Sequence, residues 1–338
     1  MTTDFEEFLT ENADSLNEYI LKAFNNGEHP DMDRYLYNLL TEYSANGGKR
    51  HRPLSCMLAA VAVGGKKVAK KAICAGVAIE HFHTAALIHD DIADDSTLRR
   101  GEPCMHITHG IGLAINAGDF ALSSVTGTVV KSEDLSNEEK LLVLRELVDM
   151  TDRTIEGQAL DIGWARDNRF DLTIDDYLMM ATHKTAYYSG AVPLAVGCAL
   201  GGGDLVQVEA MRSFGENTGL AFQIYDDVLN LVGSQEATKK DFRSDITEGK
   251  RTLIMVHAIQ NSERADELIE ILSSHTADEV KLARAVEICE ESGSIQYARD
   301  YAKKLTQDAI TFLHTSMKPS TSRDLLESMA TFFISRKN

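Results

Sequence analysis

The sequence predicts an all-α fold, and three observations lead to that prediction. Between its turn-rich breaks, the chain consists of segments of roughly 15 to 30 residues whose apolar positions recur at helical spacing. Proline occurs only five times in 338 residues, so helices can run without interruption. Strand-like alternation of polar and apolar residues is rare. We therefore expect roughly ten or more helices in a single domain that covers residues 1–338.

The breaks between the expected helices are rich in glycine, asparagine and charged residues. Segment 205–232 illustrates the helical pattern, because apolar side chains recur along it from Leu205 to Leu229 in short steps. The C-terminal third, 260–338, has the same amphipathic pattern but no motif that indicates chemistry. The breaks lie at 25–31, 44–48, 63–67, 99–104, 132–138, 166–172, 201–204 and 233–249.

The composition is that of an ordinary soluble protein, with 43% hydrophobic and 25% charged residues. A formal net charge of −18 repels nucleic-acid phosphate and anionic lipid, so we expect neither as a partner.

The five cysteines form no CxxC pair and the acidic start does not resemble a signal peptide, which favours reduced thiols in the cytoplasm. The longest apolar stretch, 56–63, is too short to cross a bilayer, so we expect no integral membrane segment.

The strongest local signal is a cluster of aspartates that follows an apolar stretch in segment 83–101. Asp90 and Asp94 are four residues apart and therefore share one face of a helix, while Asp91 and Asp95 form a parallel pair about 100° round the axis. Like charges at this spacing destabilise a bare helix, so the cluster favours a bound cation. Asp95 itself should face solvent or support the others.

A second cluster repeats the pattern as Asp226, Asp227 and Asn230, again with apolar flanks. Oxygen ligands of this kind suit Mg²⁺, which keeps several waters and is often shared with substrate phosphates. A solvated helix face or a helix cap would explain either cluster alone. Two clusters with the same spacing in apolar surroundings favour magnesium sites that face each other.

Four basic segments supply the local positive charge that so acidic a chain needs to bind a diphosphate. Lys49, Arg50 and Arg52 follow two glycines, which let the backbone approach an anion closely, and Arg99 and Arg100 follow the first acidic cluster. Arginine binds phosphate oxygens bidentately and lysine adds point charge. Each segment alone is more often a surface patch, but together they indicate an anion site. They lie at 47–53, 98–101, 183–185 and 239–252.

These motifs, in this order, resemble those of the trans-isoprenyl diphosphate synthases, the polyprenyl synthetase family. Segment 47–53 resembles the family's GGKR block, 90–94 its first aspartate-rich motif and 226–230 its second. EGQALD (156–161), HKTA (183–186) and AFQIYDD (221–227) fill the positions between them. The resemblance implies a class I terpenoid-synthase fold, a helical bundle around a deep central cavity, usually as a homodimer. It also implies condensation of an allylic diphosphate with isopentenyl diphosphate to an all-trans prenyl diphosphate.

The resemblance further implies roles for individual residues. Three Mg²⁺ ions are expected, two on Asp90 and Asp94 and one on Asp226, with Asp91, Asp227 and Asn230 supporting these ligands. Asn230 replaces the commoner third aspartate, and an amide oxygen binds Mg²⁺ less strongly than a carboxylate. The catalytic oxygens that face the carbocation would come from Lys184, Thr185 and Gln223. The allylic diphosphate would bind Arg99, Lys184, Thr185, Gln223, Lys240 and Lys250, and isopentenyl diphosphate would bind Lys49, Arg52, His83 and Arg100.

Product length in this family depends on the side chains that form the floor of the cavity below the first aspartate motif. Ala86 and Ala85 lie four and five residues before Asp90, roughly one turn down the helix, and alanine lets a growing chain pass. Phe82 is the next candidate floor, although it could equally be a core residue. We therefore expect a product of about C20 or longer, and we expect Ala85→Phe to shorten it.

Two other functions remain open from the sequence. A terpene cyclase shares the fold and a first aspartate motif, but it usually carries a different second metal motif and has no use for an isopentenyl diphosphate site. A non-catalytic regulatory subunit is supported only by Asn230, since such relatives tend to lose the first aspartate motif, which is intact here.

Overall fold

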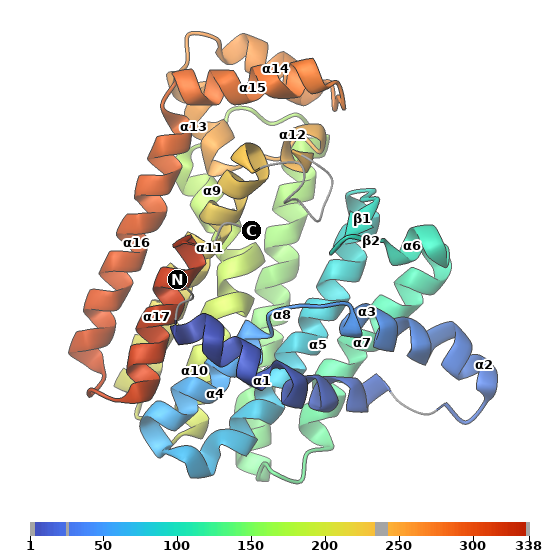
Figure 1. Ribbon diagram of the computed structural model, residues 1–338, viewed down its shortest axis with the longest axis vertical. Coiled ribbons are helices and arrows are strands. Elements are labelled where there is room, and N and C mark those ends of the chain that lie inside the picture. The colour runs from blue at the N-terminus through green and yellow to red at the C-terminus, as the bar shows by residue number, and fades with distance from the viewer. Residues whose placement is uncertain (1–3, 25–26, 234–242, 336–338) are drawn as a thin grey trace.

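Long helices form most of the chain in the computed structural model, which describes residues 4–24, 27–233 and 243–335 (Figure 1). The predicted all-α fold is confirmed. The α-helices are α1 (Asp4–Leu21), α2 (Pro30–Met32), α3 (Asn38–Ala45), α4 (His51–Gly64), α5 (Ala69–Ala93), α6 (Met105–Thr108), α7 (Ile111–Val130), α8 (Asn137–Arg166), α9 (Ile174–Ala181), α10 (Val192–Leu200), α11 (Leu205–Val232), α12 (Ser244–Thr247), α13 (Leu253–Asn261), α14 (Ala265–Ser273), α15 (Glu279–Glu291), α16 (Ser294–Ser316) and α17 (Thr321–Ser335). Short 3₁₀ turns are η1 (Lys22–Phe24) and η3 (Lys66–Val68), π-helical segments are η2 (Asp33–Tyr37) and η4 (Thr182–Ala191), and two short strands are β1 (Leu98–Arg99) and β2 (Glu102–Pro103).

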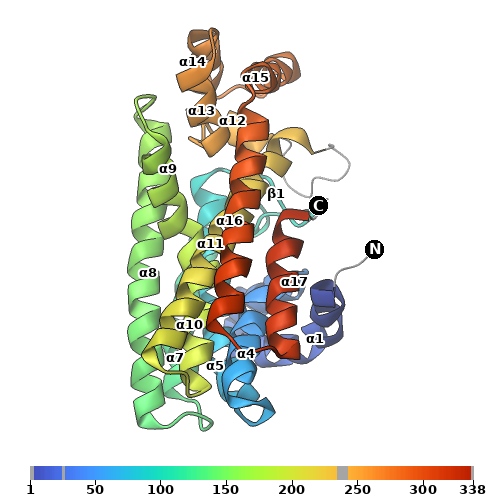
Figure 2. The same cartoon turned by 90° about the vertical axis from the view of Figure 1, so that its left-hand side faces the viewer.

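The long helices lie side by side as a bundle, with α14 and α15 at one end (Figures 1 and 2). Helix α5 packs against α4 and α7, and α11 packs against η4, α10 and α16. The first and last described helices also meet, because α1 packs on α17 and Phe5 N donates to Ser328 Oγ at 3.0 Å. The ends of α5 and α11 that carry the two aspartate clusters are thus held in one bundle.

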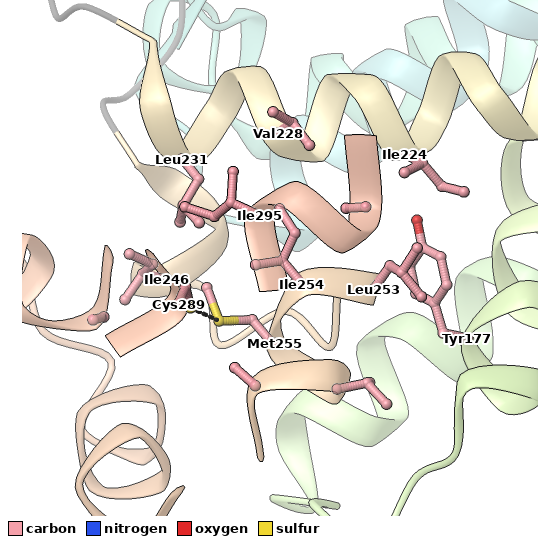
Figure 3. Packing of buried hydrophobic residues seen from close by; sticks show 14 of the residues in the cluster. Tyr177, Ile224, Val228, Leu231, Ile246, Leu253, Ile254, Met255, Cys289 and Ile295 are labelled. Carbon is pink, nitrogen blue, oxygen red and sulfur yellow. Dashed lines mark hydrogen bonds between the residues drawn. The ribbon is translucent and has the colours of Figure 1, made fainter. Parts of the chain in front are cut away.

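An apolar cluster fixes the end of α11 that carries the second aspartate cluster. Figure 3 shows Val228 and Leu231 of α11 packed against Ile254 of α13 and Ile295 of α16. All four side chains are almost fully buried. Burial of such side chains stabilises a fold by about 1.5–3 kcal/mol each. The apolar flanks noted in the sequence are therefore core contacts, and the polar residues between them point elsewhere.

Glycines allow the π-helical segment η4 to pack directly against its neighbours. A Cβ added at Gly157 in α8 would lie 2.3 Å from the backbone nitrogen of Lys184, and one at Gly215 in α11 would lie 2.3 Å from the carbonyl oxygen of Gly190. Both contacts are with backbone, which cannot move aside cheaply. Two helices thus determine the position of η4, and π-helical turns of this kind are frequent at functional sites.

Helix α5 ends within the first aspartate motif, and the chain then turns back in a small hairpin. Asp94 is the first residue after the helix, and Asp95, which is exposed, adopts a left-handed conformation with φ 51°. Strands β1 and β2 pair antiparallel, with Arg99 opposite Glu102. This hairpin returns Arg99 and Arg100 toward the cluster that precedes them.

Two helical segments are long and apolar enough to span a membrane by length and composition, although the apolar stretch 56–63 is not. The first, Lys66–Ala93, is 67% buried inside the bundle and is a core helix. The second, Ile111–Val130, is only 33% buried. It belongs to a surface that we call the α6–α8 face, with nine of the 18 exposed large apolar side chains of the described chain: Ile107, Ile111, Ile115, Val130, Leu141, Leu142, Val148, Ile155 and Ile162.

Candidate active site

A pocket of about 630 Å³ brings both aspartate clusters and most of the basic residues together. Its volume lies in the range of about 300–1,000 Å³ that is usual for small-molecule sites. Lys240 lies outside the described residues, and Asp91, Ala85, Ala86 and Phe82 are absent from the described lining. The predicted residues that line the pocket are Lys49, Arg52, His83, Asp90, Asp94, Arg99, Arg100, Lys184, Thr185, Gln223, Asp226, Asp227, Asn230 and Lys250.

The two leading carboxylates of the first cluster are held by groups from distant parts of the chain. Asp90 Oδ1 accepts a hydrogen bond of 2.9 Å from Gln158 Nε2 of α8 and lies 3.9 Å from Lys184 Nζ. Asp94 Oδ1 lies 2.7 Å from Lys250 Nζ. Burial, followed by the charge of Asp90, raises the pKa of Asp94 above its usual value. Lys250 and Lys184 offset this effect only in part, and a metal ion would stabilise the ionised carboxylate further.

Asp91 supports this arrangement from behind and does not line the pocket. Its carboxylate is 1% exposed, accepts from Tyr43 Oη at 3.1 Å and receives Arg99 Nε at 2.6 Å. Burial disfavours the charged guanidinium, but Asp91 outweighs that effect and raises the pKa of Arg99. Arg99 also approaches Asp90 Oδ2 at 3.5 Å. Asp91 thus orients an arginine that faces the pocket.

All three polar residues of the second cluster line the pocket, and two of them also hold neighbouring helices in place. Asp227 accepts hydrogen bonds from Tyr177 Oη at 2.8 Å and from Gln223 Nε2 at 2.7 Å, and burial raises its pKa to about 7. Asn230 Nδ2 donates to Ser244 Oγ at 3.1 Å, while Asn230 Oδ1 accepts from the Asp245 backbone at 3.3 Å. The amide at the third position therefore fastens the start of α12 to α11, a role that the sequence did not indicate.

Asp161 connects the two pocket lysines, and sequence reasoning assigned it no role. Its Oδ2 lies 2.6 Å from Lys184 Nζ and 3.0 Å from Lys250 Nζ. Although burial opposes ionisation, Lys184 and then Lys250 lower the pKa of Asp161 to about 2. Glu248 lies 3.6 Å from Lys250 Nζ, and burial, followed by Asp94, raises the pKa of Glu248 to about 8. In the sequence, the only feature that draws attention to Asp161 is its position as the last residue of the EGQALD motif.

The opposite end of the pocket is basic, and the groups that hold Arg52 are neutral hydroxyls. Arg52 Nη2 donates to Tyr188 Oη at 3.1 Å and to Ser189 Oγ at 2.9 Å, and Tyr188 Oη also lies 3.3 Å from His83 Nδ1. Lys49 Nζ lies 4.7 Å from the centre of the Phe332 ring. Burial, followed by the charges of Arg52 and other nearby bases, lowers the pKa of His83 well below its usual value. His83 is therefore neutral at physiological pH.

Two of the predicted catalytic side chains, Thr185 and Gln223, line the same pocket and contact each other. Thr185 Oγ1 donates to Gln223 Oε1 at 2.7 Å, which joins η4 to α11. Gln223 Nε2 in turn donates to Asp227, so the orientation of the amide is determined on both sides. Thr185 is 7% exposed, which places its hydroxyl in a largely dry part of the pocket.

The residues expected to limit product length do not share one environment. Ala86 packs beside Phe82 and Tyr188 in one apolar cluster, and the rings of Phe82 and Tyr188 are 5.6 Å apart. Ala85 is buried in a different cluster, with Phe24 and the N-terminal helices, on the other side of α5. A larger side chain at residue 85 would first meet the N-terminal helices, and the effect of Ala85 on product length stays a prediction.

The side chains present fit the Mg²⁺ ions that the motifs imply. Among the described residues, no three His, Cys, Asp or Glu side chains converge tightly enough to hold a metal by themselves. Mg²⁺ is usually bound by one or two carboxylates together with waters and substrate phosphates, so this spacing is the expected one. Asp90 and Asp94, each near a lysine ammonium, and Asp226 in the same pocket offer the required oxygens.

Comparison with known proteins gives consistent relatives along nearly the whole chain. The sequence pattern of the polyprenyl synthetase family matches residues 33–289. The chain is 38% identical to a short chain isoprenyl diphosphate synthase of Methanothermobacter thermautotrophicus, over 86% of this chain and 87% of the relative. It is 32% identical to a geranylfarnesyl diphosphate synthase of Aeropyrum pernix, over 86% of this chain and 91% of the relative.

Solved structures match equally well. A crystal structure of geranylgeranyl pyrophosphate synthetase from Pyrococcus horikoshii superposes with a TM-score of 0.89 at 32% identity, covering 98% of both chains. A geranylgeranyl pyrophosphate synthase from Corynebacterium glutamicum, crystallised with isoprenyl diphosphate and magnesium, superposes with a TM-score of 0.85 at 26% identity, covering 99% of this chain and all of that one.

Proposed function

Because this chain belongs to the polyprenyl synthetase family and is a trans-isoprenyl diphosphate synthase, we propose that it elongates an allylic diphosphate with isopentenyl diphosphate to a product of C20 or longer. The observation that supports this most directly is that one pocket is lined by both aspartate clusters and by a separate set of basic side chains with their own contacts. Two anionic substrates can then bind side by side with different partners.

We assign the allylic diphosphate to the end that contains the aspartates. Asp90, Asp94 and Asp226 would hold three Mg²⁺ ions there, and these would supply positive charge to the diphosphate as it leaves. Lys184 and Lys250 would add two ammonium groups, since both already lie within 4 Å of the first cluster. Arg99, oriented by Asp91, completes this set of cations. Preorganised charge of this kind is often the largest contribution to catalysis.

We assign isopentenyl diphosphate to the basic end, where Lys49, Arg52, His83 and Arg100 would bind it without a metal ion. The carbocation left by ionisation would face the oxygens of Thr185, Gln223 and the Lys184 backbone. Their burial excludes water, which would otherwise quench the cation. The π bond of isopentenyl diphosphate then forms the new C–C bond, and a proton passes to the departing diphosphate. No side chain needs to act as a strong base.

The proposed product length rests on the small side chain at Ala86. Residue 86 packs in the same apolar cluster as Phe82 and Tyr188, of which only Tyr188 lines the described pocket, so the tail would reach residue 86 if it grew past Tyr188 along α5. Alanine leaves room there, whereas an aromatic residue would not. The relatives named above make products of different lengths, so length has to come from this chain's own wall residues.

We further propose a homodimer that buries the α6–α8 face. Exposed apolar side chains gathered on neighbouring helices often mark an interface, and α6, α7 and α8 carry nine of them. Burial in a dimer would also explain why α7, an apolar helix, is only 33% buried within a single chain. Light scattering should then give a mass of about twice 37.3 kDa. A cytoplasmic location remains a prediction.

The test is an incubation of purified protein with Mg²⁺, labelled isopentenyl diphosphate and geranyl, farnesyl or geranylgeranyl diphosphate, followed by chromatography of the products. We expect prenyl diphosphates of C20 or longer. A pure C15 product would overturn the proposed length, and absence of turnover with every starter would support the regulatory subunit. A hydrocarbon released from an allylic diphosphate alone would instead indicate a cyclase.

A further inference from the structure

A buried ion pair lies beneath the basic end of the pocket, outside the residues assigned to substrate. Arg50 Nη1 lies 3.0 Å from Glu80 Oε1, and the two side chains are 3% and 2% exposed. Glu80 belongs to α5, one turn before His83, and both Arg50 and Glu80 line the pocket. Charged side chains are almost never fully buried unless they are paired with an opposite charge, and breaking such a pair is strongly destabilising.

Arg50 joins three helices to the loop that carries Lys49. Its Nε donates to Asn17 Oδ1 of α1 at 2.9 Å, its Nη2 donates to the Ser44 carbonyl of α3, and its Nη1 reaches Glu80 of α5. The backbone of Arg50 is left-handed, with φ 50°. A non-glycine residue keeps such a conformation only where its surroundings determine it strongly, and these three contacts do so.

The glycine loop before Arg50 is enclosed by two guanidinium groups. A Cβ added at Gly48 would lie 3.1 Å from Arg50 Nη1 and 3.2 Å from Arg100 Nη2. Arg100 Nη1 also donates to the Gly47 carbonyl at 2.8 Å. Movement of the Arg50 guanidinium would therefore displace the loop and Arg100 together, and both belong to the proposed isopentenyl diphosphate site.

Among the described lining residues from Gly48 to His83, Glu80 is the only one with a carboxylate. One of its oxygens is bound to Arg50, and the other, Oε2, is buried without a hydrogen-bond partner in the described part of the chain. A negative charge placed beside a diphosphate site repels the substrate. Its presence here therefore needs a positional explanation.

We propose that Glu80 is a positioning residue, which holds Arg50 and through it the Gly47–Arg52 segment in the geometry that binds isopentenyl diphosphate. This inference rests on the proposed function of that end of the pocket. It predicts the sign of a change in binding, because a carboxylate that acts by its charge and a carboxylate that acts by holding Arg50 affect diphosphate binding in opposite directions. Neutralising Glu80 would strengthen diphosphate binding if the residue acted only through its charge, and weaken binding if it acts by position.

The experiment compares Glu80→Gln with Glu146→Gln, which breaks a partly buried pair with Arg212 away from the pocket. We expect Glu80→Gln to raise the KM for isopentenyl diphosphate about tenfold, the effect of losing one charged hydrogen bond, and to change the KM for the allylic diphosphate less than twofold. Calorimetric titration with isopentenyl diphosphate alone should show the same weakening. The Glu146→Gln enzyme should match the wild type in both KM values.

A lowered KM for isopentenyl diphosphate, or an equal rise in both KM values, would overturn the inference. If Glu80→Gln does not fold, Glu80→Asp keeps the charge but shortens the reach, and it should raise only the KM for isopentenyl diphosphate by a smaller factor. Thermal unfolding of each variant separates loss of fold from loss of binding. Failure of the wild type itself to use isopentenyl diphosphate would instead contradict the proposed function.

Discussion

Replacing Asp161 by asparagine should destabilise the ligand-free enzyme by several kcal/mol, because one carboxylate holds two buried ammonium groups. Asp161 is 4% exposed and contacts Lys184 and Lys250 at 2.6 and 3.0 Å. Its pKa of about 2, against an ordinary value of 3.8, corresponds to roughly 2–3 kcal/mol in favour of the ionised form in the fold. Removing one partner from a buried ion pair costs about 3–5 kcal/mol, which is the same order.

The sign of the pH dependence follows from the direction of the shift. Because the folded pKa of Asp161 lies below the unfolded value, its stabilising contribution is fully present above about pH 3.8 and is lost as the pH falls through about 2. The loss in Asp161→Asn should therefore be constant across neutral pH. Measurements at pH 7.5 are sufficient to detect it.

The assay is urea unfolding followed by circular dichroism, with and without inorganic pyrophosphate and Mg²⁺. Pyrophosphate would offer Lys184 and Lys250 new negative partners, so binding should recover most of the stability that the variant lost. Asp167→Asn is the control, since that carboxylate pairs with Arg166 in solvent and should not affect unfolding. The reasoning would be refuted if both variants unfolded alike, or if the loss were the same with pyrophosphate and Mg²⁺ present.

Two further predictions concern product length and acid stability. Ala86→Phe should shorten the product in the labelled assay, whereas Ala85→Phe should lower the melting temperature and leave product length unchanged; the reverse result would place the wall on the other side of α5. His83→Gln should lose less stability than the wild type between pH 7.5 and 5.5. Because burial holds the pKa of His83 well below that of the unfolded chain, the unfolded chain takes up a proton below about pH 6.5 that the folded chain does not, and the wild type loses stability there. Equal losses in urea unfolding would show that His83 accepts the proton in the fold.

The sequence was sufficient for the helical class and for the residues that face the pocket, because both are local signals. Four-residue spacing places Asp90 and Asp94 on one side of α5, and apolar flanks identify the same ends of α5 and α11 as buried. Each motif was recognisable without knowing what lay opposite it. The aspartates and most of the basic residues of the pocket lining therefore follow from the sequence, whereas other lining residues such as Glu80 and Glu248 do not.

The supporting contacts could not be predicted, because they join residues that are far apart in the chain. Asp161 is 23 residues from Lys184 and 89 from Lys250, and nothing in a single helix shows which of its acids will be buried. Asn230 was interpreted as a weak metal ligand by its place in a motif, and only the position of α12 reveals its contacts with Ser244 and Asp245. The direction of Ala85 likewise depends on where the N-terminal helices pack.

The two ends of the pocket differ in what their charges do before substrate arrives. At the aspartate end, Lys184 and Lys250 are already paired with carboxylates. A diphosphate alone would therefore be repelled by Asp90, Asp94 and Asp226, and it would bind well only together with cations that neutralise these aspartates. At the basic end, the cations outnumber Glu80, and a diphosphate would need no metal there. In the proposed arrangement, two substrates with the same anionic group would therefore be distinguished by their need for Mg²⁺. The diphosphate that leaves would bind beside the metals, and the diphosphate that remains attached would bind where nothing assists its departure.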